Sequence, residues 1–176
     1  MNFTFADHDV KLRDGRSVHL RATTPSDETE LLQTFDRMSP NSRYMRFMRT
    51  MNEPDVGLLR KMLASFPDSG FGIVATVPAA DGIDIVGSSV AMIGADSSSC
   101  EFAITVTANY SRTGLGRVLM TALIDAARAS GLQEMEGFVL AANQPMRRLA
   151  ASLGFRDTMD PEDSGVRICR LRLVGA

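Results

Sequence analysis

The segment from Thr105 to Arg117 constrains the fold of this chain more than any other, because a strand, a short polar loop and a glycine-bearing turn follow one another there. Gly114 and Gly116 open a helix expected over residues 114–130, whose apolar residues recur at i, i+3 and i+4. The first amides of a helix lack internal acceptors and carry partial positive charge, and glycines let a bulky anion approach them. The segment therefore predicts a phosphate site, with two helix-capping glycines in an ordinary loop as the alternative.

The spacing around this turn does not match two common phosphate-binding motifs. A dinucleotide fingerprint requires a third glycine where this chain has Leu119. A P-loop requires a Gly-Lys-Ser/Thr sequence after Gly114, and that sequence is absent.

The rest of the sequence predicts one α+β domain over residues 1–176, with a core at about 10–174. We expect a central mixed, twisted sheet of about 6–7 strands flanked by about 4–5 helices. A hairpin is expected around Asp14-Gly15, because this dipeptide is a strong turn signal. Further helices are expected at 24–38, 42–50, 54–65 and 145–153, and strands at 71–77, 83–93, 101–107, 135–140, 155–158 and 166–173.

Composition excludes several classes of protein. The net charge of −2 argues against a dedicated nucleic-acid binder, and no apolar run is long enough to span a membrane. The first ten residues are polar and acidic, unlike a secretory signal peptide. Two cysteines and two histidines do not form a metal-binding pattern, so we expect no metal. A cytoplasmic protein, either a monomer or a homodimer, is the resulting expectation.

Several motifs carry a resemblance to a known family. The sequence Arg112-x-Gly114-x-Gly116-Arg117, Asn143 and Leu153-Gly154-Phe155 resemble motifs A and B of the GNAT N-acetyltransferases. Four further segments resemble the catalytic domain of bacterial protein lysine acetyltransferases: residues 12–15, 39–47, 101–103 and 142–146. The resemblance implies acetyl-CoA as co-substrate. It implies as acceptor a protein lysine, for example in an acyl-CoA synthetase.

The resemblance also assigns site residues. It places the CoA pyrophosphate on the backbone amides of Arg112, Thr113, Gly114, Leu115, Gly116 and Arg117. It places the pantetheine arm, like an added strand, on the edge formed by Ile104, Thr105 and Val106. Asn143 is expected to contact the CoA arm, to cap the following helix, or to do both.

Two positions depart from the family pattern. Ser111 stands where relatives usually have Gln or Arg, so we expect a looser diphosphate clamp that still uses the Ser111 amide. Ala150 stands where many relatives have a tyrosine that protonates the leaving thiolate. The thiolate would then leave unassisted or take a proton from water, because a thiol pKa is near 8.5. Four arginines, at 112, 117, 147 and 148, are expected near a CoA phosphate.

Acetyl transfer to an amine requires the neutral amine. A lysine with a pKa of about 10.4 is deprotonated in about 1 of 2500 molecules at pH 7, a cost of about 4.6 kcal/mol. Glu101 is the candidate general base and matches the family's catalytic glutamate, with Glu136 in reserve. A solvent-facing glutamate at a strand start is the alternative. A backbone N–H at 104–106 would bind the oxyanion.

The acceptor side is less constrained by the sequence. The segment 39–49 combines Arg43, Arg46 and Arg49 with Tyr44 and Phe47, and the resemblance places it over the acceptor cleft. A helix that packs its aromatic residues into the core and leaves its arginines solvated is the alternative. For the whole chain, a small-molecule amine acetyltransferase and a catalytically weak CoA-binding module also remain open.

Overall fold

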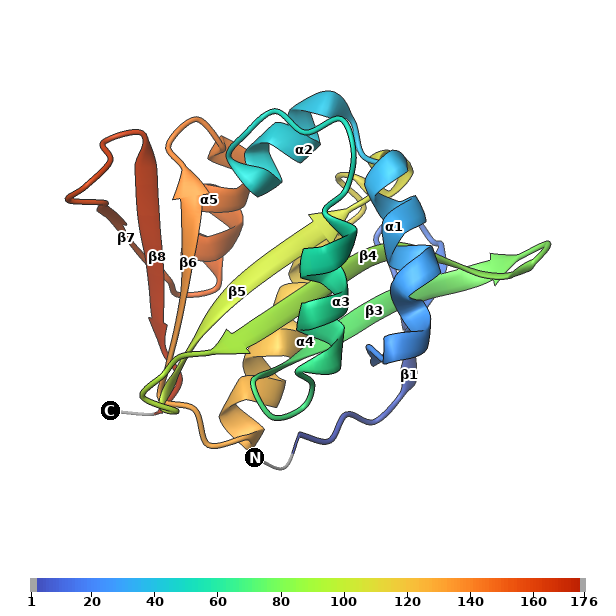
Figure 1. The fold of residues 1–176 in the computed structure, drawn as a ribbon, viewed down its shortest axis with the longest axis horizontal. Helices are drawn as coiled ribbons and strands as arrows, with labels where there is room; N and C mark the ends of the chain where they lie inside the picture. Colours follow the sequence, from blue (N-terminus) through green and yellow to red (C-terminus); the bar gives the residue numbers. More distant parts are fainter. Residues whose placement is uncertain (1–2, 175–176) are drawn as a thin grey trace.

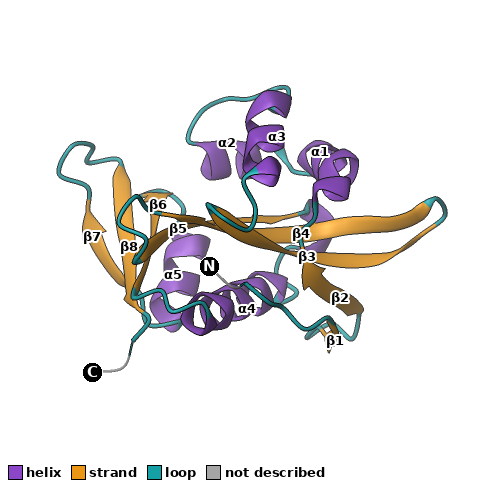
Figure 2. Cartoon of the chain, turned by 60° about the horizontal axis from the view of Figure 1, so that its bottom comes forward, coloured by secondary structure: helices purple, strands orange, loops and turns teal. Residues whose placement is uncertain are grey.

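A computed structural model describes residues 3–174 as one sheet with helices on both faces (Figures 1 and 2). The strands are β1 His8–Lys11, β2 Ser17–Ala22, β3 Gly70–Ala79, β4 Gly82–Ile93, β5 Ser99–Val106, β6 Glu134–Leu140, β7 Arg156–Met159 and β8 Val166–Arg172. The helices are α1 Glu28–Asp36, α2 Pro40–Phe47, α3 Val56–Ala64, α4 Leu115–Ala129 and α5 Gln144–Ser152, with short 3-10 turns η1 Pro25–Asp27 and η2 Ala108–Tyr110.

The sheet order is β1-β2-β3-β4-β5-β6-β8-β7. This confirms the predicted α+β class and mixed sheet. The sheet has eight strands, one more than the upper expected number, because the hairpin around Asp14-Gly15 contributes two strands, β1 and β2. Within residues 3–174, β5 and β6 form the one parallel pair.

Each face of the sheet has its own helical layer. Helices α1, α2 and α3 cover one face, and α4 and α5 cover the other (Figure 2). Helix α4 supplies much of the core, because its stripe of Leu115, Leu119, Met120 and Leu123 is fully buried. None of the helices in the described part of the chain is long and apolar enough to cross a membrane.

Capping side chains fix where α2 and α3 begin. The Ser39 hydroxyl accepts a hydrogen bond from the Ser42 amide at 3.1 Å, and Pro40 takes the first helical position. Helix α2 therefore begins at Pro40, two residues before the predicted start. The Asp55 carboxylate accepts from the Leu58 amide at 2.9 Å and starts α3.

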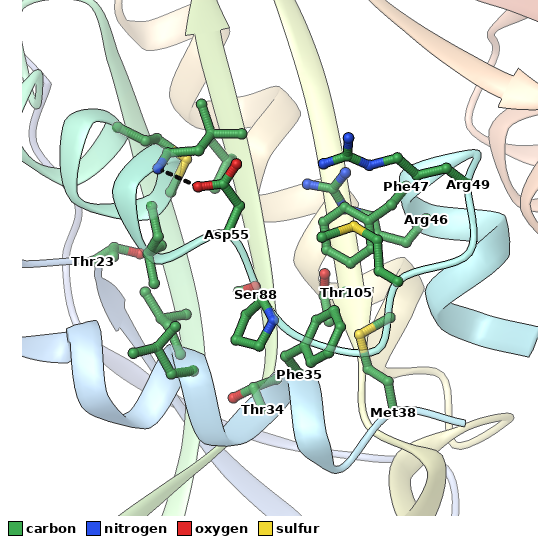
Figure 3. A pocket seen from close by; sticks show the side chains of 18 residues that line it. Thr23, Thr34, Phe35, Met38, Arg46, Phe47, Arg49, Asp55, Ser88 and Thr105 are labelled. Carbon is green, nitrogen blue, oxygen red and sulfur yellow. Dashed lines mark hydrogen bonds between the residues drawn. The ribbon is translucent and has the colours of Figure 1, made fainter. Parts of the chain in front are cut away.

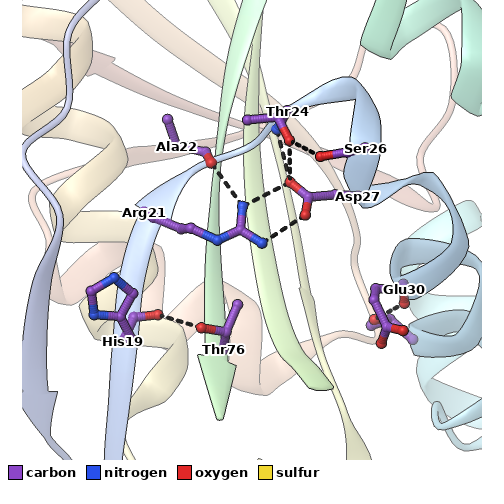
Figure 4. Close-up of polar contacts among 9 residues, drawn as sticks. His19, Arg21, Ala22, Thr24, Ser26, Asp27, Glu30 and Thr76 are labelled. Atoms are coloured by element: carbon purple, nitrogen blue, oxygen red, sulfur yellow. Dashed lines mark hydrogen bonds and ion pairs between the residues drawn. The ribbon is translucent and has the colours of Figure 1, made fainter. Parts of the chain in front are cut away.

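A buried ion pair attaches the start of this helical layer to the sheet (Figure 4). The Arg21 guanidinium on β2 donates to both carboxylate oxygens of Asp27, at 2.6 and 2.8 Å. The Thr24 amide donates to the same carboxylate at 2.8 Å. Burial alone would raise the pKa of Asp27, but the hydrogen bonds from Arg21 and Thr24 leave it below its ordinary value. The pair thereby fixes η1 and α1 against β2.

Candidate active site

The parallel strands β5 and β6 separate part-way along their length. They pair from Ser99 with Glu134 to Glu101 with Glu136, and beyond these residues they diverge (Figure 1). The Thr107 amide donates to the Val86 carbonyl, and the Gly94 amide donates to the Ser99 carbonyl. These two bonds show which residues of β5 point their amides toward β4 and which point them away. The amides of Ile104 and Val106 therefore point to the open side, toward β6. This edge could accept an extended ligand as an added strand.

Thr105 is placed differently from its two neighbours. By the same alternation its amide faces β4, and its side chain lines a cavity on the face that α1–α3 cover. Of the three edge residues predicted from the sequence, Ile104 and Val106 thus present backbone donors to the gap between the strands. Thr105 contributes to the other side of the site.

Gly137 on β6 lies beside the point where the strands diverge. A Cβ atom at this position would lie 2.4 Å from the Phe102 ring, which also packs edge-on against Phe155. A strand glycine can mark such a close approach. The ring therefore occupies the space that a side chain at position 137 would need.

We expect Gly137→Ala to lower the free energy of unfolding by about 1–3 kcal/mol, because the new methyl group overlaps the Phe102 ring. Urea unfolding measures this, and the double variant with Phe102→Ala should lose less than the sum of the single losses, since the overlap is removed. Gly57→Ala on α3 is the matched control, because its Cβ meets nothing closer than 3.6 Å. If the two losses are additive, overlap with the Phe102 ring is not the cause of the Gly137→Ala effect.

Backbone amides without acceptors converge at the start of α4. Within residues 3–174 the amides of Arg112, Thr113, Gly114, Gly116 and Arg117 have no hydrogen-bond acceptor. The Leu115 amide approaches the Thr113 hydroxyl at 3.4 Å, and that hydroxyl donates to the Tyr110 carbonyl at 2.7 Å. Arg112 and Gly114 have positive φ angles of 62° and 92°, which turn the loop around these amides. The geometry suits a phosphate group.

One expectation about this loop is wrong, and one of the four arginines expected near the phosphate is already paired. The Ser111 amide is not free, because it donates to the Ala108 carbonyl at 3.2 Å. Arg147, which is expected near a CoA phosphate, already has protein partners: its guanidinium binds Asp157 at 2.7 Å and the Ala141 carbonyl at 3.1 Å. Asp157 lies ten residues along the chain on β7, so no local pattern in the sequence indicates this pairing. Arg117 donates to the Ser152 hydroxyl at 2.6 Å.

Arg13 was missed as a candidate ligand. Its amide donates to the Thr113 carbonyl at 3.1 Å, and its side chain lies across Gly114, with Nε 2.9 Å from where a Cβ at that glycine would be. Residues 12–15 are among the segments that carry the family resemblance, but they had suggested no role. The β1–β2 turn thus brings a further cation to the loop.

If the loop binds the CoA pyrophosphate, as the family resemblance implies, Arg13→Ala should weaken acetyl-CoA binding about three- to tenfold, because one charge-assisted contact to phosphate is lost. Calorimetric titration at low salt measures the dissociation constant. Arg156→Ala on β7 serves as the control, since this exposed arginine lies on the edge strand beyond β8. An unchanged dissociation constant for Arg13→Ala would mean that this side chain only packs against the loop.

Asn143 and Ala150 lie on or just before α5. The side-chain oxygen Oδ1 of Asn143 accepts a hydrogen bond from the Met146 amide at 3.2 Å, so its predicted capping role is confirmed. Its NH₂ group has no hydrogen-bond partner within residues 3–174, so it is free to donate to a ligand. Ala150 is buried and carries no hydroxyl, so this position cannot protonate a thiolate.

Glu101 lies where β5 and β6 begin to diverge, on the face that α1–α3 cover. Its pair partner on β6 is Glu136, which accepts from Arg170 at 2.9 Å. Burial raises the pKa of Glu101, the Glu136 carboxylate raises it further, and the Arg46 guanidinium on α2 partly offsets both effects. Neighbouring groups surround part of the carboxylate, but the side chain still has enough solvent exposure for an amine to reach it.

Helix α2 does not leave all its arginines in solvent. Arg43 lies over the Phe35 ring at 4.2 Å and donates to the Phe35 carbonyl at 3.0 Å. The Arg46 side chain is buried in part and lines an apolar cavity together with Phe47 (Figure 3). Tyr44, in contrast, is 45% exposed. The alternative with packed aromatic residues and solvated arginines is therefore wrong for Tyr44 and Arg46.

Comparison with known proteins assigns the family. Residues 17–156 match the model of the acetyltransferase (GNAT) domain. The chain belongs to the GNAT acetyltransferase family. This GNAT chain is 36% identical over 168 residues to acetyltransferase PA5475 of Pseudomonas aeruginosa, covering 95% of this chain and 90% of that protein. The family and this relative identify it as an N-acetyltransferase.

Two further comparisons place this GNAT domain more closely. It is 30% identical over 145 residues to acetyltransferase Pat of Mycolicibacterium smegmatis, covering 82% of this chain and 43% of that protein. The GNAT domain of S. lividans PAT superposes with a TM-score of 0.84 at 21% identity, covering 94% of this chain and 96% of that one. At this identity the structural match shows the GNAT fold.

Proposed function

We propose that the chain transfers the acetyl group of acetyl-CoA to a lysine side chain of a protein. The observation that carries the proposal is the position of Glu101 where β5 and β6 diverge, between an open strand edge and α2. The resemblance to bacterial protein lysine acetyltransferases and the similarity to Pat support the choice of acceptor.

The chain's own groups fit acetyl-CoA along one continuous path. The free amides between Arg112 and Arg117 would bind the pyrophosphate at the start of α4. The Val106 amide and the Asn143 NH₂ group would hold the pantetheine arm between β5 and β6, which leaves the Ile104 amide for the thioester end. The thioester would then lie toward the point of divergence, near Glu101.

Glu101 acts as the general base in this proposal. Its carboxylate takes the proton from the lysine ammonium, directly or through water, and the neutral amine attacks the thioester carbonyl. The Ile104 amide donates to the oxyanion that forms. When this intermediate collapses, the C–S bond breaks, and the CoA thiolate leaves unassisted or takes a proton from water. The raised pKa of Glu101 makes it a better proton acceptor than an ordinary carboxylate.

Direct attack in a ternary complex is favoured over a covalent enzyme intermediate. Cys100 is the nucleophile nearest to Glu101 in the sequence, but it is 1% exposed. Burial raises the pKa of its thiol to about 12, so the reactive thiolate is not populated near neutral pH.

Acetylation of the proteins in a bacterial extract, with small amines assayed in parallel, tests the proposal. Incubation of the enzyme and acetyl-CoA with a bacterial protein extract should add acetyl groups to discrete lysines, which mass spectrometry identifies. The Glu101→Gln variant in the same extract corrects for non-enzymatic acetylation. If only small amines are acetylated, the lysine assignment is wrong and the small-molecule alternative holds. If nothing is acetylated while acetyl-CoA still binds, the chain is a CoA-binding module.

A further inference from the structure

An apolar cavity of about 170 Å³ lies between the sheet and helices α1, α2 and α3 (Figure 3). Its walls are mainly leucine, methionine and phenylalanine side chains from the three helices and the α2–α3 loop: Leu31, Leu32, Phe35, Met38, Phe47, Met51, Leu58, Leu59 and Met62. Its floor is Ser88 and Val90 of β4 and Thr105 of β5. An engineered apolar cavity of about 150 Å³ holds benzene, so this one has room for one large side chain.

The cavity lies on the same face of the sheet as Glu101. The floor residues Val90 and Ser88 pair with Ala103 and Thr105 of β5. Glu101 lies two residues before Ala103 and four residues before Thr105 on the same strand. Side chains two residues apart along a strand share a face. The acceptor amine must approach from the face that carries its base. The cavity is therefore beside the route of the acceptor, while the start of α4 lies on the opposite face.

Arg46 is a charged residue in the lining of this otherwise largely apolar cavity. Its Nε atom is buried and has no hydrogen-bond partner in the described part of the chain. Arginine keeps its charge in proteins, and a buried Nε–H without a partner is costly until an acceptor binds it. The Glu101 carboxylate is the charged group that acts on Arg46 from β5. Arg49 also lines this end of the cavity (Figure 3). Asp55 is the acidic residue of the lining, and it already accepts the Leu58 amide.

We propose that this cavity reads the sequence around the target lysine: it receives one large apolar side chain of the acceptor polypeptide, while Arg46 binds a neighbouring Asp or Glu carboxylate. The inference rests on the proposed lysine acetyltransferase function. The preference for a large apolar residue follows from the size of the cavity. The preference for an acidic residue follows from charge complementarity to Arg46 and Arg49. Arg46 then determines specificity, and it is distinct from the base.

A set of lysine peptides tests this. Each peptide carries one Asp and one Phe, placed in turn at the positions from three residues before to three residues after the lysine. In matched peptides Asn replaces the Asp, or Ala replaces the Phe. CoA release gives kcat/KM with the intact enzyme. We expect one arrangement with both residues to be preferred at least tenfold over its Asn version and at least tenfold over its Ala version.

Variants then assign each preference to its contact. Arg46→Met should bring the Asp-to-Asn ratio close to one, and Met62→Trp should bring the Phe-to-Ala ratio close to one by filling the cavity. Each ratio compares kcat/KM for two peptides with the same variant. Any effect of Arg46 on Glu101 is common to both peptides and therefore cancels. Arg60→Met is the control, because Arg60 lies on α3 but is exposed and paired with Glu28. Unchanged acetyl-CoA affinity shows that each variant is folded, and Met62→Phe is a milder replacement.

The outcomes separate this inference from the proposed function. Turnover of lysine peptides with no preference for Asp or Phe, or with ratios unaffected by Arg46→Met and Met62→Trp, overturns the inference alone. Absence of turnover on every lysine peptide, together with acetylation of free amino acids, overturns both, because the cavity would then serve a small molecule.

Discussion

Glu101→Gln is expected to lower kcat about 10²- to 10⁴-fold while leaving acetyl-CoA affinity unchanged. Glutamine keeps the size of the side chain but cannot take a proton from the amine. The amides proposed to bind the pyrophosphate lie at the start of α4 and do not involve Glu101. Steady-state CoA release with a lysine peptide measures kcat, and calorimetry measures the affinity.

Glu136→Gln is the matched control for this experiment. Glu136 is the register partner of Glu101 but binds Arg170, so its loss should leave kcat at its optimum pH within about threefold. Removing the Glu136 carboxylate should lower the pKa of Glu101. The acidic limb of the pH–rate profile should therefore move to lower pH. A Glu101→Gln enzyme with wild-type kcat would remove Glu101 from the mechanism.

The parts of the site that are local in sequence were predictable. The free amides after Arg112 follow from a glycine turn at a helix start, and the Asn143 cap follows from its place before Pro145. Both depend on residues within a few positions of one another. The helix and strand order likewise follows from periodicity and turn residues.

The parts that depend on distant contacts were not predictable. Arg147 was expected at a phosphate because its charge is visible, while its partner Asp157 is brought to it by the packing of β7 against α5. The cavity could not be seen either, because it combines three helices with β4 and β5. In the sequence Arg46 is one of three regularly spaced arginines, and only the packing of α2 shows that its Nε is buried and Arg43 is paired.

The second large effect concerns stability and arises at Asp27. Asp27→Asn should lower the free energy of unfolding by about 3 kcal/mol, because it leaves the partly buried Arg21 without its carboxylate. The asparagine can still accept one hydrogen bond but cannot match the charge. Urea denaturation at pH 7 measures the loss. Asp125→Asn, which breaks an exposed pair with Arg128, should change stability by less than about 0.5 kcal/mol.

The pH dependence of the same variant gives a separate test. The pKa of Asp27 in the folded protein lies below its value of about 3.9 in the unfolded chain. The stabilisation that the ionised carboxylate provides is therefore complete above about pH 3.9, and it is lost as the pH falls through the folded pKa. The difference in unfolding free energy between wild type and Asp27→Asn should thus be constant from pH 7 to 5 and should shrink below about pH 4. A difference that stays constant to pH 2 would mean that the loss comes from altered packing of η1, and that the Asp27 charge contributes nothing.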